Sequence, residues 1–169
     1  MQAIEALLTR RSIRKYTQAP IPAEILEKLF LCTLAAPSAK NQKPLHLVVI
    51  QEKKTLSQIA AFHPHAAMCK EAALGILICS DTKIETTESF CLQDGAAAAE
   101  NLLVAAHALG LGAVWVSVHP KEERIASFVR LLGLPENILP IALIVLGHPN
   151  EKKTLKEPPE KSRLHFEKW

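Results

Sequence analysis

The sequence predicts an α+β or α/β fold in which helices flank a central mixed sheet, in a single domain over residues 1–169. The composition, 49% hydrophobic and 22% charged, is that of a globular protein and excludes a disordered chain. Four short runs rich in apolar and β-branched residues alternate with segments of helical periodicity. These expected strands cover residues 45–50, 74–79, 113–118 and 141–146.

Two helices are expected before the first strand. The first covers residues 3–9, whose apolar positions recur every three or four residues. The second begins at Pro22, because proline is favoured in a first helical turn, and ends near Ala36, because Pro37 follows. Their apolar faces consist of Ile4, Leu7 and Leu8 in the first helix and of Ile25, Leu26, Leu29 and Phe30 in the second.

Three more helices are expected between the later strands. A short one covers residues 55–62 and is ended by the sequence His-Pro-His at 63–65. The longest begins at Asp94, a favourable N-cap, and runs to about Leu109. Its alanine-rich surface allows close packing inside the domain or in a subunit interface. A last helix covers residues 120–132.

Residues 147–169 form a tail of different composition. Residues 151–162 are charged and proline-bearing, yet the chain closes with Leu164, Phe166 and Trp169. Three large apolar side chains need a cover. Either the tail wraps a partner subunit, which makes the protein an obligate dimer, or it docks on its own domain.

Several protein classes are excluded by what the sequence lacks. It has no apolar run near the roughly 20 residues of a membrane span and no secretory signal, so we expect a cytoplasmic protein without a membrane partner. A net charge of +3 and 5% aromatic residues argue against nucleic acid. No glycine-rich phosphate loop is present, so a bound phosphate would be held by side chains or a helix start.

A dense cationic stretch follows the first helix. Arg10, Arg11 and Arg14 lie within five positions, with Ser12 among them. Guanidinium groups bind phosphate oxygens in bidentate fashion, and a serine hydroxyl adds a hydrogen bond. A solvated surface loop is the usual meaning of such a run alone, but residues 161–163, Lys-Ser-Arg, repeat the chemistry near the far end of the chain.

The loop at residues 37–44 is a second candidate site. Ser38 and Ala39 are small enough for a planar ligand to approach the backbone, and the Asn41 amide offers both a donor and an acceptor. An ordinary connection between a helix and a strand is the alternative.

Four segments together resemble one family, the flavin mononucleotide (FMN)-dependent nitroreductases. Residues 10–16 (RRSIRKY) are similar to its RRSxRxY/F signature, and residues 37–44 (PSAKNQKP) to its PSAxNxQPW loop. Residues 101–112 (NLLVAAHALGLG) resemble its NLLLAAxxLGLG helix and turn, and residues 161–169 (KSRLHFEKW) its SRxHxEKW close. The resemblance spans nearly the whole chain, with the segments in the family's order.

The resemblance implies a nitroreductase-like α+β fold, with a mostly antiparallel or mixed sheet, built as an intertwined homodimer with two FMN sites at the subunit interface. One subunit would hold the phosphate, ribityl and pyrimidine parts of FMN through Arg10, Arg11, Ser12 and Arg14. The other would contribute Pro37, Ser38, Ala39 and Asn41. Trp115, Val116 and Ser117 would lie against the isoalloxazine, and Lys161 and Arg163 would close on the phosphate.

The chain departs from the family pattern in three places. Residues 43–45, Lys-Pro-Leu, replace Gln-Pro-Trp, so an aromatic is missing. The stretch before the SRxH close is short. Residues 63–70, which border the flavin in relatives, match no motif.

The resemblance implies that NADH or NADPH delivers hydride to the flavin N5 and that the reduced flavin passes it to a small nitroaromatic or quinone-type acceptor in ping-pong turnover. We expect no catalytic side chain, because the flavin carries the chemistry. Arg14 would be an electrostatic stabiliser of the negative charge that reduction places along N1 and the C2 carbonyl.

Alternatives stay open at this point. His63, His65 and Cys69 could bind a metal, but Pro64 favours a turn, and we predict no metal site. A non-catalytic dimer that binds flavin for sensing is a second class of function. Reductive dehalogenation or flavin fragmentation on the same scaffold is a third.

Overall fold

The computed structural model describes residues 1–154 and 161–169. The helices of this part are α1 (Ala3–Thr9), α2 (Ala23–Leu34), α3 (Lys53–Phe62), α4 (Glu88–Ala108) and α5 (Glu122–Leu132). The strands are β1 (Leu45–Ile50), β2 (Leu74–Asp81), β3 (Gly112–Ser117) and β4 (Ile138–Gly147). Short 3-10 turns lie at η1 (Ala39–Asn41), η2 (Ala67–Lys70) and η3 (Lys161–Arg163).

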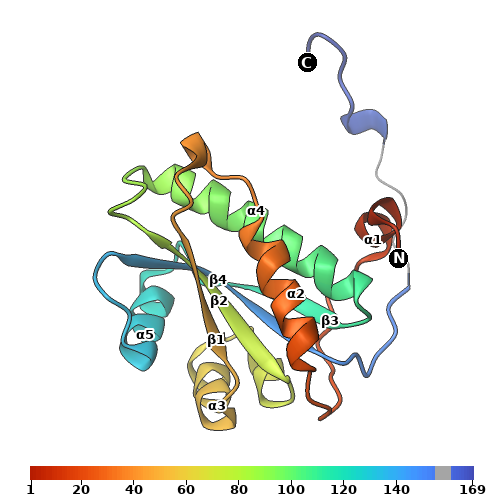
Figure 1. Cartoon of the computed structure of the whole chain (residues 1–169), viewed down its shortest axis with the longest axis vertical. Helices are drawn as coiled ribbons and strands as arrows, with labels where there is room; N and C mark the ends of the chain where they lie inside the picture. Colours follow the sequence, from red (N-terminus) through yellow and green to blue (C-terminus); the bar gives the residue numbers. More distant parts are fainter. Residues whose placement is uncertain (155–160) are drawn as a thin grey trace.

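The four strands form one sheet in the order β1-β2-β4-β3, and each neighbouring pair is antiparallel. Helices cover both faces of this sheet, α2 and α4 on one side and α3 and α5 on the other (Figure 1). The expected α+β fold, with its four strands separated by helices, is therefore confirmed. Because β3 is an edge strand, one of its sides is open to another segment.

Each face of the sheet carries its own apolar core. On one face, Leu29 of α2 and Leu102 of α4 pack around Ile144. On the other face, Phe128 of α5 packs with Val145, which follows Ile144 in β4. This alternation along β4 follows from the two-residue period of a strand. The edges of the sheet, and not its faces, are left for ligands.

The expected start of α4 is wrong. The helix begins at Glu88, so Asp94 lies inside it and is 6% exposed. Its Oδ1 accepts a hydrogen bond of 2.9 Å from the backbone N–H of Ala39. The carboxylate that could cap a helix is used instead to hold the loop at residues 37–44. The last helix likewise starts later than expected, at Glu122.

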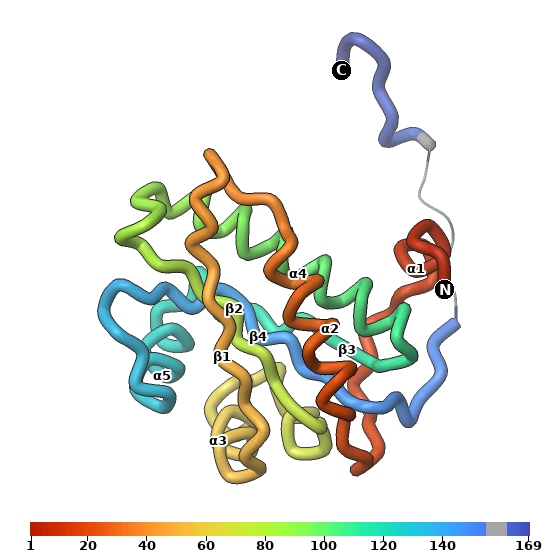
Figure 2. Tube along the Cα trace, viewed as in Figure 1, coloured from red at the N-terminus to blue at the C-terminus, as the bar shows by residue number. Residues whose placement is uncertain are grey.

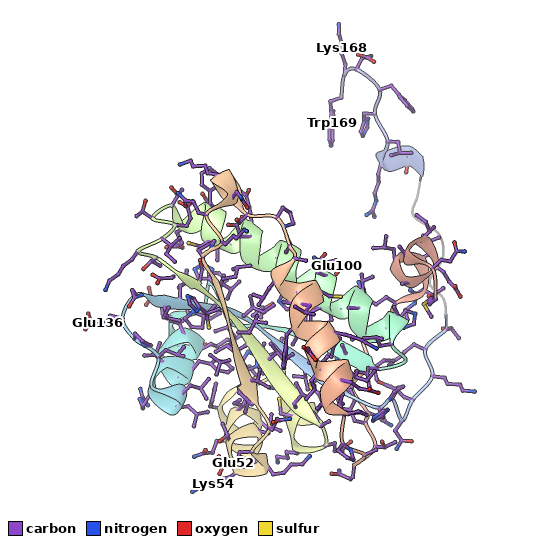
Figure 3. All side chains as sticks on the ribbon, viewed as in Figure 1. Glu52, Lys54, Glu100, Glu136, Lys168 and Trp169 are labelled. Carbon is purple, nitrogen blue, oxygen red and sulfur yellow. The ribbon has the colours of Figure 1, made fainter. Side chains whose placement is uncertain are left out.

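Large apolar side chains stay exposed on the single chain. They include Ile4, Leu7 and Leu8 of α1, Leu31 and Leu34 of α2, and Leu164, Phe166 and Trp169 of the tail. The end of the chain lies apart from the sheet and its helices, as Lys168 and Trp169 show (Figure 3). Within residues 1–154 and 161–169, no helix combines the length and the hydropathy that a bilayer crossing requires.

Candidate functional site

The cationic segment after α1 lies along the open edge of β3. Ser12 forms a parallel bridge with Ala113, and the Ile13 N–H donates to the Ala113 carbonyl at 3.0 Å. Four residues later, Tyr16 forms an antiparallel bridge with Pro149. The segment thus joins the edge of the sheet at one end and the chain just after β4 at the other.

Two glycines allow this close approach. Gly112 and Gly147 face each other across β3 and β4. A Cβ added to Gly112 would lie 2.7 Å from Ile13 Cγ2, and one added to Gly147 would lie 2.8 Å from Tyr16 Cδ1. Both distances are shorter than any ordinary carbon contact, so only glycine leaves room for these two side chains.

The Tyr16 side chain fastens the segment further. It is 3% exposed, and its hydroxyl lies 2.5 Å from the Ile13 carbonyl oxygen and 3.1 Å from the Val145 carbonyl oxygen. Burial raises the pKa of Tyr16 far above the usual range, so the hydroxyl remains a donor. One buried ring therefore ties its own segment to β4.

The segment lines a cavity of about 520 Å³, which we call the arginine cavity. Its wall consists of Leu7, Arg10, Arg11, Ser12, Arg14, Lys153 and Thr154. The four cationic-segment residues expected to bind FMN are thus brought together. Lys161 and Arg163, expected beside them, belong instead to the C-terminal segment that lies apart in Figure 1.

The arginines of this cavity differ in what they contact. The Arg10 Nε lies 3.2 Å from Glu100 Oε1 on α4. Arg11 donates to three carbonyl oxygens, those of Leu8, Arg10 and Thr154, at 3.1, 2.6 and 3.2 Å. Across residues 1–154 and 161–169, neither the Arg14 guanidinium nor the Ser12 hydroxyl makes a hydrogen bond or ion pair, which leaves both for a ligand.

The Glu151 carboxylate contacts two residues of the arginine cavity. Glu151 Oε1 accepts from the Arg14 backbone N–H at 2.6 Å, and Oε2 lies 3.1 Å from the Lys153 ammonium. The hydrogen bond from the Arg14 backbone lowers the pKa of Glu151, so the group is a carboxylate at neutral pH. Glu151 orients Lys153 without pairing with the Arg14 guanidinium.

A second cavity, of about 300 Å³, continues from Arg14, and we call it the histidine cavity. It is lined by Arg14, Pro64, His65, Ala67, Met68, Val114 and Trp115. No carboxylate is among these residues, and most of them are apolar. Arg14 lines both cavities, so a cationic cavity and a more apolar one adjoin at this residue.

Of the three β3 residues expected beside the flavin ring, two face the open edge of the sheet and one faces the core. Successive residues of a strand point their backbone groups to opposite sides. The Ala113 carbonyl faces the cationic segment, so the backbone groups of Trp115 and Ser117 face the same open edge. Val116 is 2% exposed and belongs to the core with Phe128. Its side chain is therefore no part of the site.

The loop at residues 37–44 is not brought to these cavities within the single chain. It lies at the far end of β1 from the cationic segment (Figure 2). Lys40, Asn41 and Lys43 have positive φ values, 52°, 56° and 55°. The Asp94 contact with Ala39 and a 2.9 Å hydrogen bond from the Lys43 N–H to Ser38 Oγ hold this shape.

Two histidines near the cavities, His107 and His63, have hydrogen-bond partners for their rings. His107 Nε2 lies 2.8 Å from Thr9 Oγ1, which links α4 to α1. His63 uses both ring nitrogens, and burial raises the pKa of the nearby Cys69 thiol to about 12. Within the described part of the chain, no three histidine, cysteine or acidic side chains are grouped to hold a metal ion.

The sequence profile of the nitroreductase family matches residues 7–75 and 64–148. The chain belongs to the nitroreductase family. It is 40% identical, over its whole length and 88% of the relative, to a protein of Methanothermobacter thermautotrophicus provisionally named an NADH dehydrogenase or NAD(P)H nitroreductase. It is 30% identical, over 90% of this chain and 68% of the relative, to the NADPH-flavin oxidoreductase of Vibrio harveyi.

Solved structures of nitroreductase-family proteins superpose closely on this one. One is a Parabacteroides distasonis protein provisionally named an NADH dehydrogenase or NAD(P)H nitroreductase. It has a TM-score of 0.95 and 36% sequence identity, and the match covers 100% of this chain and 99% of that one. A Desulfovibrio desulfuricans protein, provisionally described as a nitroreductase and solved with FMN, has a TM-score of 0.85 at 29% identity, over 100% and 98%.

Some residues that line the two cavities are not predicted by the sequence. Lys153 and Thr154 lie in a charged stretch without a recognisable motif, and only the folding of the chain after β4 brings them to Arg10. His65 and Met68 belong to the segment that matched no motif. The proline next to His65, which predicts a turn, was the only available signal for that part of the site.

The fit of Tyr16 over Gly147 gives a first prediction. Gly147→Ala should lower the free energy of unfolding by about 1–3 kcal/mol, because the added methyl group overlaps the buried ring. Thermal unfolding should show a fall in Tm of about 2–10 °C.

The matched control is the same substitution in a Tyr16→Ala background. Alanine lacks Cγ and Cδ1, the two Tyr16 atoms that would lie nearest to the added methyl group, so Gly147→Ala should cost less there. An equal loss in both backgrounds would show that the ring does not require the glycine.

Proposed function

We propose that this protein is an FMN-dependent oxidoreductase that transfers hydride from NADH or NADPH, through the flavin, to nitroaromatic or quinone-type acceptors by a ping-pong mechanism. Family membership and the relatives' names, NAD(P)H nitroreductase and NADPH-flavin oxidoreductase, support flavin-dependent NAD(P)H oxidoreduction. The acceptors and the order of steps are the finer part of the proposal.

The observation that carries the proposal is the pair of cavities that share Arg14. FMN has a dianionic phosphate at one end and a planar, largely apolar ring at the other. The arginine cavity offers cations and the Ser12 hydroxyl for the phosphate, where Lys153 and Thr154 add further donors. The histidine cavity offers Trp115, Val114 and Met68 to the ring. The residues present therefore fit this cofactor.

Bound FMN would supply the hydride chemistry, and the protein would bind and orient it. Arg14 stands where the two cavities meet, with no partner in the described part of the chain, so its charge is free to stabilise negative charge on the pyrimidine side of the ring. The backbone groups of Trp115 and the Ser117 N–H face the open edge and would align the ring along β3, while the Ser117 carbonyl accepts from His63 and Arg124.

The proposed function requires a homodimer. The loop at residues 37–44 is firmly shaped but lies away from the cavities of its own chain, which supports its delivery to a second copy. Apolar side chains of α1, α2 and the tail are exposed in one chain and would be covered in two. The proposal includes a tail of the single domain, residues 147–169, that reaches the partner and carries Lys161 and Arg163 as phosphate ligands. Residues 155–160 of this tail lie outside the described part of the chain.

The purified protein tests the enzymatic function directly. It should be yellow, and anaerobic addition of NADH or NADPH should bleach the visible flavin bands, because hydride transfer reduces the ring. Bands that persist with either nucleotide would contradict the proposed electron donor and favour a flavin-binding dimer without this activity.

Arg14 should be important for holding FMN. Arg14→Ala should weaken FMN binding by about 10- to 100-fold, the value of one hydrogen bond to a charged group. Titration of the apoprotein, followed by flavin fluorescence, measures the change. Arg130→Ala, a substitution of an exposed arginine on α5, is the control and should bind like the wild type. Unchanged affinity in Arg14→Ala would show that this cation lies elsewhere.

Mixed dimers test whether each site draws on two chains. Asn41→Ala and Arg14→Ala homodimers should both bind FMN weakly, because every site lacks one contact. After random reassociation, half the dimers carry one intact site, so about a quarter of all sites should regain wild-type affinity. No recovery, despite exchange of subunits shown by mass spectrometry, would mean that both residues serve the same chain's site.

A further inference from the structure

His63 lies behind the histidine cavity, at the end of α3. Its side chain is 2% exposed although histidine is a polar residue. It stands between the end of β3 and the turn at residues 64–68, which supplies Pro64, His65, Ala67 and Met68 to the cavity wall. The proposed function uses that wall but gives His63 itself no role.

The hydrogen bonds of His63 define its protonation. The backbone N–H of His65 donates to His63 Nδ1 at 3.2 Å, so Nδ1 carries no proton. The single ring proton of the neutral form is then on Nε2, which donates to the Ser117 carbonyl oxygen at 2.9 Å. One neutral ring therefore joins the turn to the end of β3.

The groups around His63 favour this neutral form. Burial is the main cause that lowers its pKa. The hydrogen bond to the Ser117 carbonyl opposes this effect, and the charges of Arg124 and His65 add to it, so that the pKa stays below its usual value. Arg124 Nη1 also donates to the Ser117 carbonyl, at 3.0 Å. Phe62 presents its ring at 6.5 Å between centroids, and no carboxylate is among the groups that act on His63. Protonation would put a second N–H at Nδ1, against the His65 N–H that it now accepts.

We propose that His63 is a positioning residue that, in its neutral form, fastens the turn at residues 64–68 to β3 and so forms the wall of the histidine cavity against which the flavin ring lies. Protonation breaks the link to His65, loosens the wall and weakens flavin binding. The identity of the ligand rests on the proposed function, while the link itself belongs to the protein alone.

The sign of the pH effect follows from the lowered pKa. The folded protein favours neutral His63 more than the unfolded chain does, so the stabilisation is complete above the usual histidine value of about 6.5. It is lost progressively as the pH falls below that value and through the pKa of His63 in the folded protein.

The test compares FMN affinity at about pH 7.5 and pH 5.5 in three proteins. The phosphate of FMN titrates in this range, but it does so equally for all three, so the ratio between proteins isolates His63. In the variant His63→Gln, the side-chain amide cannot ionise. Its NH₂ group can replace Nε2 as the donor to the Ser117 carbonyl, and its oxygen can replace Nδ1 as the acceptor for the His65 N–H. The control is His107→Gln, which removes the other partly buried histidine near the site.

At about pH 7.5, His63→Gln should bind FMN within about 3-fold of the wild type, and at about pH 5.5 it should bind about 5-fold or more tightly than the wild type. His107→Gln should follow the wild type at both values. A parallel fall of His63→Gln and the wild type would overturn the proposal, as would a His63→Gln affinity that is far weaker at the higher pH.

A second measurement needs no flavin. In the apoprotein, the ring nitrogen shifts of His63 in NMR spectra should show the Nε2–H form at neutral pH, and the His65 amide signal should move in step with His63 protonation. An Nδ1–H form, or a His65 amide indifferent to that protonation, would overturn the link. Failure of the wild type to bind FMN, with these NMR results intact, would count against the proposed function alone.

Discussion

The site depends on one packing constraint, the seating of Ile13 and Tyr16 over Gly112 and Gly147. The cationic segment is neither a helix nor a full strand, and it joins the sheet through two isolated bridges. Its position is therefore fixed by how closely two side chains approach the backbone of β3 and β4. The paired glycines permit that approach, and the Tyr16 hydroxyl completes it with bonds to two carbonyl groups. This packing fixes the position of Arg14, which lies between the two anchors, and of Arg10 and Arg11, which directly precede them.

Electrostatics then divides the cations into two groups. Gathering three guanidinium groups and a lysine around one cavity is unfavourable unless some charge is compensated. Arg10 faces Glu100, Lys153 faces Glu151, and Arg11 contacts three carbonyl oxygens. Among the arginines that line this cavity, the guanidinium without a partner in the described residues is that of Arg14, which lines both cavities. The same arrangement explains why the cationic end suits a phosphate, while the other end, without carboxylates, suits a ring that gains negative charge.

The strands and the cationic segment could be predicted from the sequence, because a run of β-branched residues or a cluster of arginines is recognised from a few neighbouring positions. Prediction failed where a residue serves a distant part of the chain. Asp94 has the chemistry of an N-cap, yet its carboxylate holds Ala39, 55 positions away, and the helix starts earlier. Nothing in the sequence indicated that the partner of His63 is a carbonyl of β3. Lys153 joins Arg10 only through the path of the chain after β4. None of these contacts leaves a sequence motif.

The central claim is that the arginine cavity recognises the phosphate of a flavin nucleotide. Calorimetric titration of the apoprotein with FMN and with riboflavin, which differ only in that phosphate, tests it most directly. FMN should bind about 100-fold or more tightly, and the difference should shrink as salt concentration rises, since it arises from charge. Equal affinity for the two flavins at low salt would contradict the account, whatever else the protein binds.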